Sequence, residues 1–175
     1  PQMVDCSIAV NVSPKQLNDP YFAGRIATIL AESHLTADKL EIEITESAVM
    51  ENPEQGIRIL NKIHELGVKI SIDDFGTGYS ALNYLRKFAV DSIKIDRSFI
   101  EDTPVSEDDM NLVKVIIAMA HSMNLTVIAE GVETEAQHDF LLEHYCNYGQ
   151  GYLYGKPWSA EVVEALLSDI IPVDK

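Results

Sequence analysis

Short runs of apolar, often β-branched residues alternate along the chain with longer segments in which apolar residues recur every three or four positions. The short runs predict β-strands and the longer segments predict helices. Several of the strand runs are almost continuously apolar, which is typical of parallel strands covered on both faces. The predicted strands span residues 7–12, 40–45, 68–72, 92–95 and 126–129, with a weaker one over 148–153.

Capping residues mark the helices between these strands. Asn52 followed by Pro53 is typical of a helix N-terminus, and Gly67 stands where that helix should end. Ser106 and Thr134 each open a segment with the spacing of a capping box. The alternation of strands and helices predicts a parallel sheet with right-handed crossovers, either a barrel or a doubly wound sheet. Neither GxGxxG nor GxxxxGK[ST] occurs, which disfavours the nucleotide-binding forms of the wound sheet.

Length and charge narrow the function classes. The 175 residues predict one domain, residues 1–175, although a closed (β/α)₈ barrel usually needs about 200–250 residues. A net charge of −15 disfavours binding to duplex nucleic acid or to anionic lipid, so an anionic ligand would need local cations.

Cysteine usage and hydropathy bear on location. The two cysteines form no CxxC pair, which disfavours a zinc site and a disulfide framework and favours a reducing compartment. We see neither a membrane-spanning run nor a signal peptide and expect a cytoplasmic location. Because the chain begins at Pro1 and enters apolar sequence almost at once, we expect it to be a piece of a longer protein, which could itself be membrane-anchored.

Polar residues occur at the end of every predicted strand. Parallel strands direct their carboxyl ends to one face, where barrel enzymes carry their active sites, so these side chains should converge. Carboxylate and amide oxygens suit hard cations such as Mg²⁺ or Mn²⁺ rather than zinc. The residues in question are Asn11, Glu43, Glu46, Asp73, Asp74, Lys94, Asp96, Glu130, Glu133 and Gln150.

Each of these residues also has a purely structural interpretation. Glu133 could only support the helix that Thr134 opens, and Asp96 with Arg97 could be a local ion pair. Glu43 and Lys94 are harder to explain in this way, because both alternate with isoleucines inside apolar strands and a charge is costly to bury without a partner.

The segment from Asp73 to Ser80 is the most specific. Adjacent carboxylates at a strand end repel each other unless a cation lies between them. The two glycines that follow suit a loop that closes over a ligand. The loop residues are Phe75, Gly76, Thr77, Gly78, Tyr79 and Ser80.

Together these segments resemble the EAL-domain cyclic di-GMP phosphodiesterases. The matching pieces run in family order through essentially the whole chain: 10–13 with Gln16, 43–47, 73–82, 93–96, 129–133, and 150–152 with Pro157. The resemblance implies a TIM-type (β/α) barrel that hydrolyses cyclic di-GMP to linear pGpG with two Mg²⁺ or Mn²⁺ ions.

The resemblance also implies a role for each group. It makes Asn11, Glu43, Asp73, Asp74 and Glu130 metal ligands. It makes Lys94, Glu130 and Gln150 catalytic residues that orient or deprotonate the attacking water. Glu46 would anchor the loop, and the implied substrate and loop residues are Glu46, Phe75, Gly76, Thr77, Gly78, Tyr79, Ser80, Glu133 and Pro157.

One departure from the family is large. The name-giving Glu-Ala-Leu should precede the strand of Asn11, whereas the Glu164-Ala165-Leu166 of this chain falls in a C-terminal amphipathic helix, where Glu164 should be a surface residue. We therefore expect an N-terminally truncated, incomplete barrel with an exposed sheet edge, weak metal binding and slow or no turnover. The parent protein should carry upstream signalling domains, and a homodimer is compatible with the sequence.

Two other functions stay open at this point. The domain could be a receptor that binds cyclic di-GMP without cleaving it, although this chain keeps every ligand position that it covers. It could also be an unrelated barrel enzyme acting on a small carbonyl compound or sugar phosphate, which would predict a phosphate site rather than a carboxylate cluster.

Overall fold

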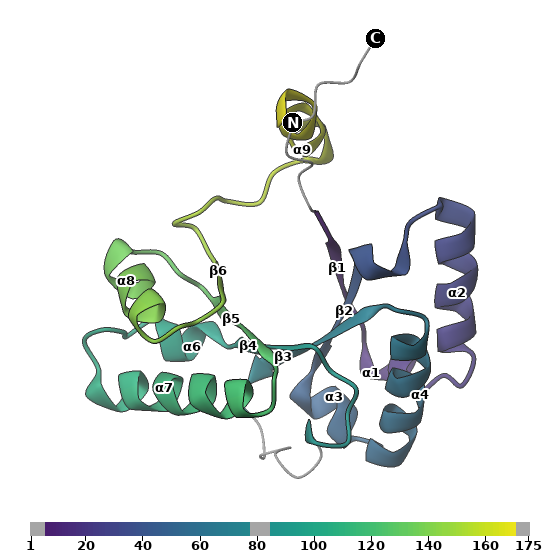
Figure 1. The fold of residues 1–175 in the computed structure, drawn as a ribbon, viewed down its shortest axis with the longest axis horizontal. Coiled ribbons are helices and arrows are strands. Elements are labelled where there is room, and N and C mark those ends of the chain that lie inside the picture. The colour runs from purple at the N-terminus through teal and green to yellow at the C-terminus, as the bar shows by residue number, and fades with distance from the viewer. Residues whose placement is uncertain (1–5, 78–84, 171–175) are drawn as a thin grey trace.

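The computed structural model describes residues 6–77 and 85–170, and its centre is a curved sheet of six parallel strands (Figure 1). The strands lie in the order of the chain, β1-β2-β3-β4-β5-β6. Sequential parallel order with intervening helices is the arrangement of a (β/α) barrel, so the predicted incomplete barrel is confirmed. The strands are β1 (Ile8–Asn11), β2 (Leu40–Thr45), β3 (Lys69–Phe75), β4 (Ser92–Ile95), β5 (Thr126–Glu130) and β6 (Tyr148–Gln150).

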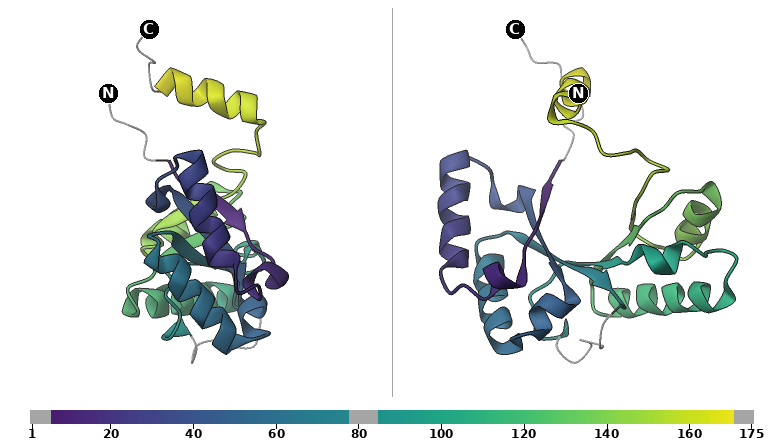
Figure 2. Two further views of the ribbon diagram at one scale, coloured as in Figure 1. Left: turned by 90° about the vertical axis from the view of Figure 1, so that its right-hand side faces the viewer. Right: turned by 180° about the vertical axis from the view of Figure 1, so that it is seen from behind.

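The helices surround the outer side of the curved sheet, apart from α9, which stands off on the open side (Figures 1 and 2). The helices are α1 (Pro14–Leu17), α2 (Phe22–Ser33), the 3₁₀ turn η1 (Ala37–Lys39), α3 (Glu46–Met50), α4 (Pro53–Glu65), α6 (Arg97–Ile100), α7 (Glu107–Ser122), α8 (Glu135–Glu143) and α9 (Ala160–Ile170). None of the described helices is both long and apolar enough to cross a membrane.

Burial and capping follow the sequence pattern. Ile70, Ile93 and Ile95 are fully buried at the centre of the sheet, and helix α7 packs Val113, Ile116, Ile117 and Ala120 inward. The Asn52 side chain accepts a hydrogen bond from the Gln55 N–H, as expected for the start of α4. Thr134 and Gln137 form a complete capping box, whereas Ser106 accepts a hydrogen bond from the Asp109 N–H.

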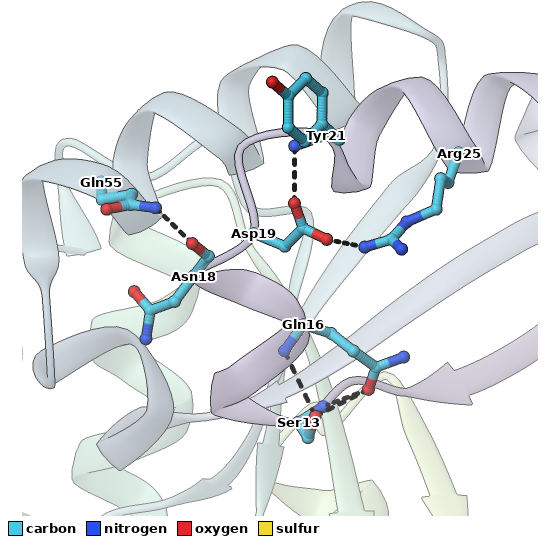
Figure 3. A network of polar contacts seen from close by, with 7 residues as sticks. All are labelled: Ser13, Gln16, Asn18, Asp19, Tyr21, Arg25 and Gln55. Carbon is cyan, nitrogen blue, oxygen red and sulfur yellow. Dashed lines mark hydrogen bonds and ion pairs between the residues drawn. The ribbon is translucent and has the colours of Figure 1, made fainter.

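A network of polar contacts fixes the turn between β1 and α2 (Figure 3). Ser13 and Gln16 form a capping box around α1. Asp19 accepts a hydrogen bond from the Tyr21 N–H at 2.9 Å and forms an ion pair with Arg25. Gln16, one of the residues that carry the family resemblance, therefore has a structural role here.

Two predicted strand boundaries were wrong. Strand β3 does not end at Ile72 but continues to Phe75, because a register shift after Ile72 inserts an irregularity and lets Phe75 pair with Ile95. Strand β6 ends at Gln150 rather than at Leu153. Beyond Gln150 the chain turns across Val132, whose N–H donates to the Gln150 carbonyl and whose carbonyl accepts from the Leu153 N–H, both at 3.0 Å.

The two outer strands of the sheet, β1 and β6, are exposed. Every residue of β1 and β6 is exposed, with Ile8 at 57% and Tyr148 at 66%. Among the described residues β1 pairs only with β2 and β6 only with β5, so the sheet has two open edges. The predicted exposed edge is therefore present.

Candidate metal and catalytic centre

The parallel registers bring the predicted polar residues to one end of the sheet. Asn11 lies directly beside Glu43, and Gln150 lies directly beside Glu130. Asp73 lies beside Thr45, next to the start of α3. Because residues opposite each other on parallel strands direct their side chains to the same face, these groups share the carboxyl-terminal face of the sheet.

Lys94 is the centre of this face. Its Nζ lies 2.7 Å from Glu130 Oε1, 2.8 Å from Glu43 Oε1 and 3.2 Å from Asp73 Oδ1. Only 3% of Lys94 is exposed, and its neighbours Ile93 and Ile95 are fully buried in β4. The ammonium therefore lies within ion-pair distance of carboxylates from three strands, β2, β3 and β5, at once.

The irregularity in β3 places two consecutive carboxylates at the same site. Asp74 has a φ of +52°, a left-handed conformation that Asp tolerates better than most residues. One oxygen from each of Asp73, Asp74 and Glu130 lies within 4.8 Å of the others, close enough to share one cation. The strand was predicted to end just before this irregularity. The irregularity lets both Asp73 and Asp74 reach the same site.

Burial and charge shift the acidities of this cluster. Burial lowers the pKa of Lys94, but hydrogen bonds to Glu130 and Glu43 and the adjacent negative charges outweigh it and raise that pKa well above its ordinary value. Burial raises the pKa of Glu130, which Lys94 only partly offsets. Burial, and then the charges of Asp73 and Asp96, raise the pKa of Asp74. The single positive charge of Lys94 therefore does not balance the negative charges of the surrounding carboxylates.

The residues present fit a divalent cation. Asp73 Oδ1 is buried and makes no hydrogen bond to any described group, although the Lys94 ammonium lies 3.2 Å away. A buried carboxylate oxygen without a hydrogen bond is costly, and a bound cation would satisfy it. A set made only of oxygen ligands selects hard cations such as Mg²⁺, Mn²⁺ or Ca²⁺.

The loop that follows β3 is partly described. The Gly76 N–H donates to Oε2 of the buried Glu46 at 3.4 Å, and Thr77 Oγ1 donates to the Asp74 carbonyl at 2.8 Å. Phe75 was predicted as a loop residue, but it lies in β3 and is buried, because the register shift extends the strand. Gly78, Tyr79 and Ser80 lie outside the described residues.

The two remaining residues that were predicted to contact substrate, Glu133 and Pro157, are both exposed and lie on different segments of the chain. Glu133 follows β5, and its N–H donates to Gln137 Oε1 at 2.8 Å, which links it to the cap of α8. Pro157 lies in the irregular segment before α9. Glu164 is exposed on α9, as expected. The structure shows no contact of Glu133 or Pro157 with the carboxylate cluster.

Sequence reasoning missed the part that Asp96 plays. Its Oδ1 accepts hydrogen bonds from the Ser98 N–H at 3.0 Å and the Ser98 hydroxyl at 2.5 Å, which caps α6, and these bonds outweigh burial and lower its pKa. The Asp96 side chain also lies close enough to Asp74 to raise the pKa of Asp74. The spacing of Asp96 and Ser98 is that of a helix cap and could have been recognised. The contact with Asp74 could not.

Gly131 allows β5 to end in this geometry. Its φ is +70°, and a Cβ at this position would lie 2.6 Å from the Cβ of Arg97. Only glycine combines that backbone conformation with so close an approach. Gly131 therefore fixes the chain directly after Glu130.

A hollow lies at the amino-terminal end of the sheet, opposite the carboxylate cluster. It has a volume of about 680 Å³ and is lined by residues at the amino-terminal ends of the strands, including Lys69, Ser92 and Thr126. The carboxylates around Lys94 do not line it. In barrels of this type the chemistry lies at the carboxyl-terminal face, so the cluster around Lys94 is the better candidate.

A comparison with known protein families decides the assignment. The model of the EAL domain matches residues 2–157. The chain belongs to the EAL domain family. The matched segment contains every group of the site described above.

Named relatives of this EAL chain include a cyclic di-GMP phosphodiesterase. NbdA of Pseudomonas aeruginosa is 46% identical over 160 residues, which cover 91% of this chain but only 20% of NbdA. The solved structure of the PaMucR phosphodiesterase in complex with c-di-GMP is 41% identical with a TM-score of 0.88, and the match covers 93% of this chain and 66% of that one. Klebsiella pneumoniae BlrP1, solved with manganese and cyclic di-GMP, is 32% identical with a TM-score of 0.80 over 86% of this chain and 39% of that one.

Proposed function

We propose that this EAL chain carries a metal-dependent phosphodiesterase site that hydrolyses cyclic di-GMP to linear pGpG. The observation that carries the proposal is that one oxygen from each of Asp73, Asp74 and Glu130 lies within 4.8 Å of the others. The names of the relatives supply the nucleotide, because the cluster by itself supports only metal-assisted hydrolysis.

Five residues would hold the metal: Asn11, Glu43, Asp73, Asp74 and Glu130. Two Mg²⁺ or Mn²⁺ ions held there would supply an activated water and neutralise the negative charge that develops on the scissile phosphate. The manganese in the BlrP1 complex supports the choice of a hard divalent cation. Asn11 and Gln150 lie on the exposed outer strands, so the two ends of the site depend on the least buried elements.

Lys94 would act as a hydrogen-bond donor and positioning cation rather than as a base. Its raised pKa keeps the side chain protonated at neutral pH, so its N–H groups can orient a water or bind a phosphate oxygen. Glu130, whose pKa is raised, is better suited to accept a proton from that water. Gln150, in register with Glu130, would hold the water or substrate through its amide.

Glu46 would couple the metal site to the loop. It begins α3 directly after β2, and it accepts the Gly76 N–H just beyond the Asp73-Asp74 pair. This loop would cover the nucleotide through Gly76, Thr77, Gly78, Tyr79 and Ser80, and we propose that Glu133 and Pro157 line the substrate path. Phe75 would support the loop from the core.

The deciding experiment follows product formation under single-turnover conditions. Stoichiometric protein is incubated with cyclic di-GMP and Mn²⁺, and pGpG is quantified by chromatography, with Asp73→Asn as the inactive comparison. We expect slow Mn²⁺-dependent pGpG formation that chelation abolishes, because Asn11 and Gln150 lie on exposed outer strands that hold them less firmly than the central strands hold the carboxylates. Binding of cyclic di-GMP without any pGpG would refute hydrolysis and favour the receptor function instead.

A further inference from the structure

The candidate metal site already contains a cation of its own. The Lys94 ammonium contacts Asp73 and Glu130, and the same two carboxylates belong, with Asp74, to the group that can share a metal ion. A divalent cation and the ammonium therefore compete for two of the same carboxylates. Glu43, the third contact of Lys94, is outside that group.

The ammonium is buried beside its carboxylate partners. Lys94 is 3% exposed, and its neighbours Ile93 and Ile95 in β4 are fully buried. Removing it would leave Glu43, Asp73 and Glu130 as neighbouring carboxylates without a counter-charge. Such an arrangement is strongly unfavourable in a buried site.

We propose that Lys94 is the internal counter-ion of the metal-free site: it holds Asp73 and Glu130 in place until a divalent cation takes them over. Metal binding would then move the ammonium away from Asp73 and Glu130. This inference rests on the proposed metal-dependent function, but it concerns assembly and affinity of the site rather than hydrolysis.

Two consequences follow from this competition. The metal-free protein keeps an assembled site, because the ammonium replaces the missing cation. The affinity for metal is lower than the carboxylates alone would provide, because each ion must displace the ammonium and is repelled by it at close range. Replacing Lys94 with a neutral residue of similar shape should therefore raise the affinity for metal and destabilise the site in the absence of metal.

The test compares Lys94→Met with the intact chain and with Lys62→Met. Lys62 is exposed on α4, so its replacement removes the same charge without touching the site. Lys94→Arg keeps the charge as a second variant. Mn²⁺ affinity is measured by titration calorimetry at mildly alkaline pH, where the carboxylates are ionised, and thermal unfolding is recorded with EDTA and with Mn²⁺.

We expect Lys94→Met to bind Mn²⁺ about tenfold more tightly than the intact chain, with Lys62→Met and Lys94→Arg within about threefold of it. In EDTA, Lys94→Met should unfold at a clearly lower temperature or fail to fold, and Mn²⁺ should restore it. Equal or weaker Mn²⁺ binding by a folded Lys94→Met overturns the inference. So does a variant that stays unfolded in Mn²⁺, because the metal then cannot replace the ammonium.

The outcomes also separate the inference from the proposed function. If the intact chain binds Mn²⁺ and Lys94→Met binds no more tightly, only the counter-ion role fails. If neither binds Mn²⁺, the metal dependence fails with it.

Discussion

Gly151 offers a sharp test of how the end of β6 is built, because there is no room for a side chain at this position. A Cβ added to Gly151 would lie 2.1 Å from the Val132 carbonyl oxygen, 2.3 Å from the Val132 nitrogen and 2.7 Å from the Val132 carbonyl carbon. All three are backbone atoms and cannot rotate away. Gly151→Ala must therefore push the turn after β6 off the segment that follows β5.

The cost can be worked out from the contacts that would be lost. Overpacking against a fixed backbone costs about 1–3 kcal/mol. The displacement also breaks the two backbone hydrogen bonds of Val132, to Gln150 and to Leu153, each 3.0 Å long and worth about 1 kcal/mol. We expect a total loss of about 3–5 kcal/mol in the free energy of unfolding. At about 2–4 °C per kcal/mol for a chain of this size, the midpoint falls by roughly 10 °C.

The matched control is Gly24→Ala. Gly24 lies in α2, and a Cβ there meets nothing within 4 Å. This replacement should stabilise the protein by about 0.5–1 kcal/mol, because alanine is the better helix former. Urea and thermal unfolding of both variants measure the difference. A Gly151→Ala midpoint equal to that of the intact chain, or shifts of the same sign in both variants, would show that the turn is not packed as described.

Three further predictions concern two residues of the site and one surface residue. Glu46→Ala should lower the rate of Mn²⁺-dependent pGpG formation about tenfold or more, because the Gly76 N–H loses its hydrogen-bond acceptor. An unchanged rate in single-turnover assays would show that Glu46 does not position the loop. Since the raised pKa of Asp74 makes protons compete with metal, Mn²⁺ affinity should increase as pH rises from the acidic range toward neutrality, and titrations of Asp74→Asn should show a flatter slope; equal slopes would contradict this role. Glu164→Ala should leave the rate of pGpG formation unchanged and should change the free energy of unfolding by no more than about 0.5 kcal/mol. Any loss of Mn²⁺ binding in this variant would contradict the surface assignment of Glu164.

The pattern of the sequence was sufficient for parallel strands and for the end of the sheet that carries the site, whereas the barrel order of the strands came from the family resemblance. Apolar runs between capped helices predict parallel strands, and polar residues at the strand ends then have to meet at one face. Glu43 and Lys94 could be singled out because a charge between buried isoleucines needs a partner. These arguments depend on local pattern and on one topological rule, and both hold in the structure.

The course of β3 could not be predicted in the same way. Asp73-Asp74 followed by glycine has the composition of a loop, so the pattern ends the strand at Ile72. The strand continues because the register shift places Phe75 against Ile95 in the core, and Asp74 accepts a left-handed backbone to allow it. Burial of Phe75 is a tertiary effect, and no pattern of neighbouring residues reports it.

The partners within the site were also beyond sequence reasoning. That Lys94 reaches three carboxylates depends on the registers of β2, β3 and β5, each of which would move a side chain to the opposite face if it slipped by one residue. The approach of Asp96 to Asp74 likewise joins the residue after β4 to the end of β3. Chemistry at strand ends is readable from the sequence, whereas the pairing of those groups requires the three-dimensional register.

The site has a rigid centre and two exposed flanks. This difference predicts which residues of the site are affected first when the protein is destabilised. Glu43, Lys94 and Glu130 lie on strands that are paired on both sides, so their positions are fixed by the sheet. Asn11 and Gln150 lie on β1 and β6, which pair on one side only within the described part of the chain and are exposed throughout. Local opening begins where burial and pairing are weakest. Mild destabilisation should therefore impair the contributions of Asn11 and Gln150 to the site before it disperses the carboxylates around Lys94.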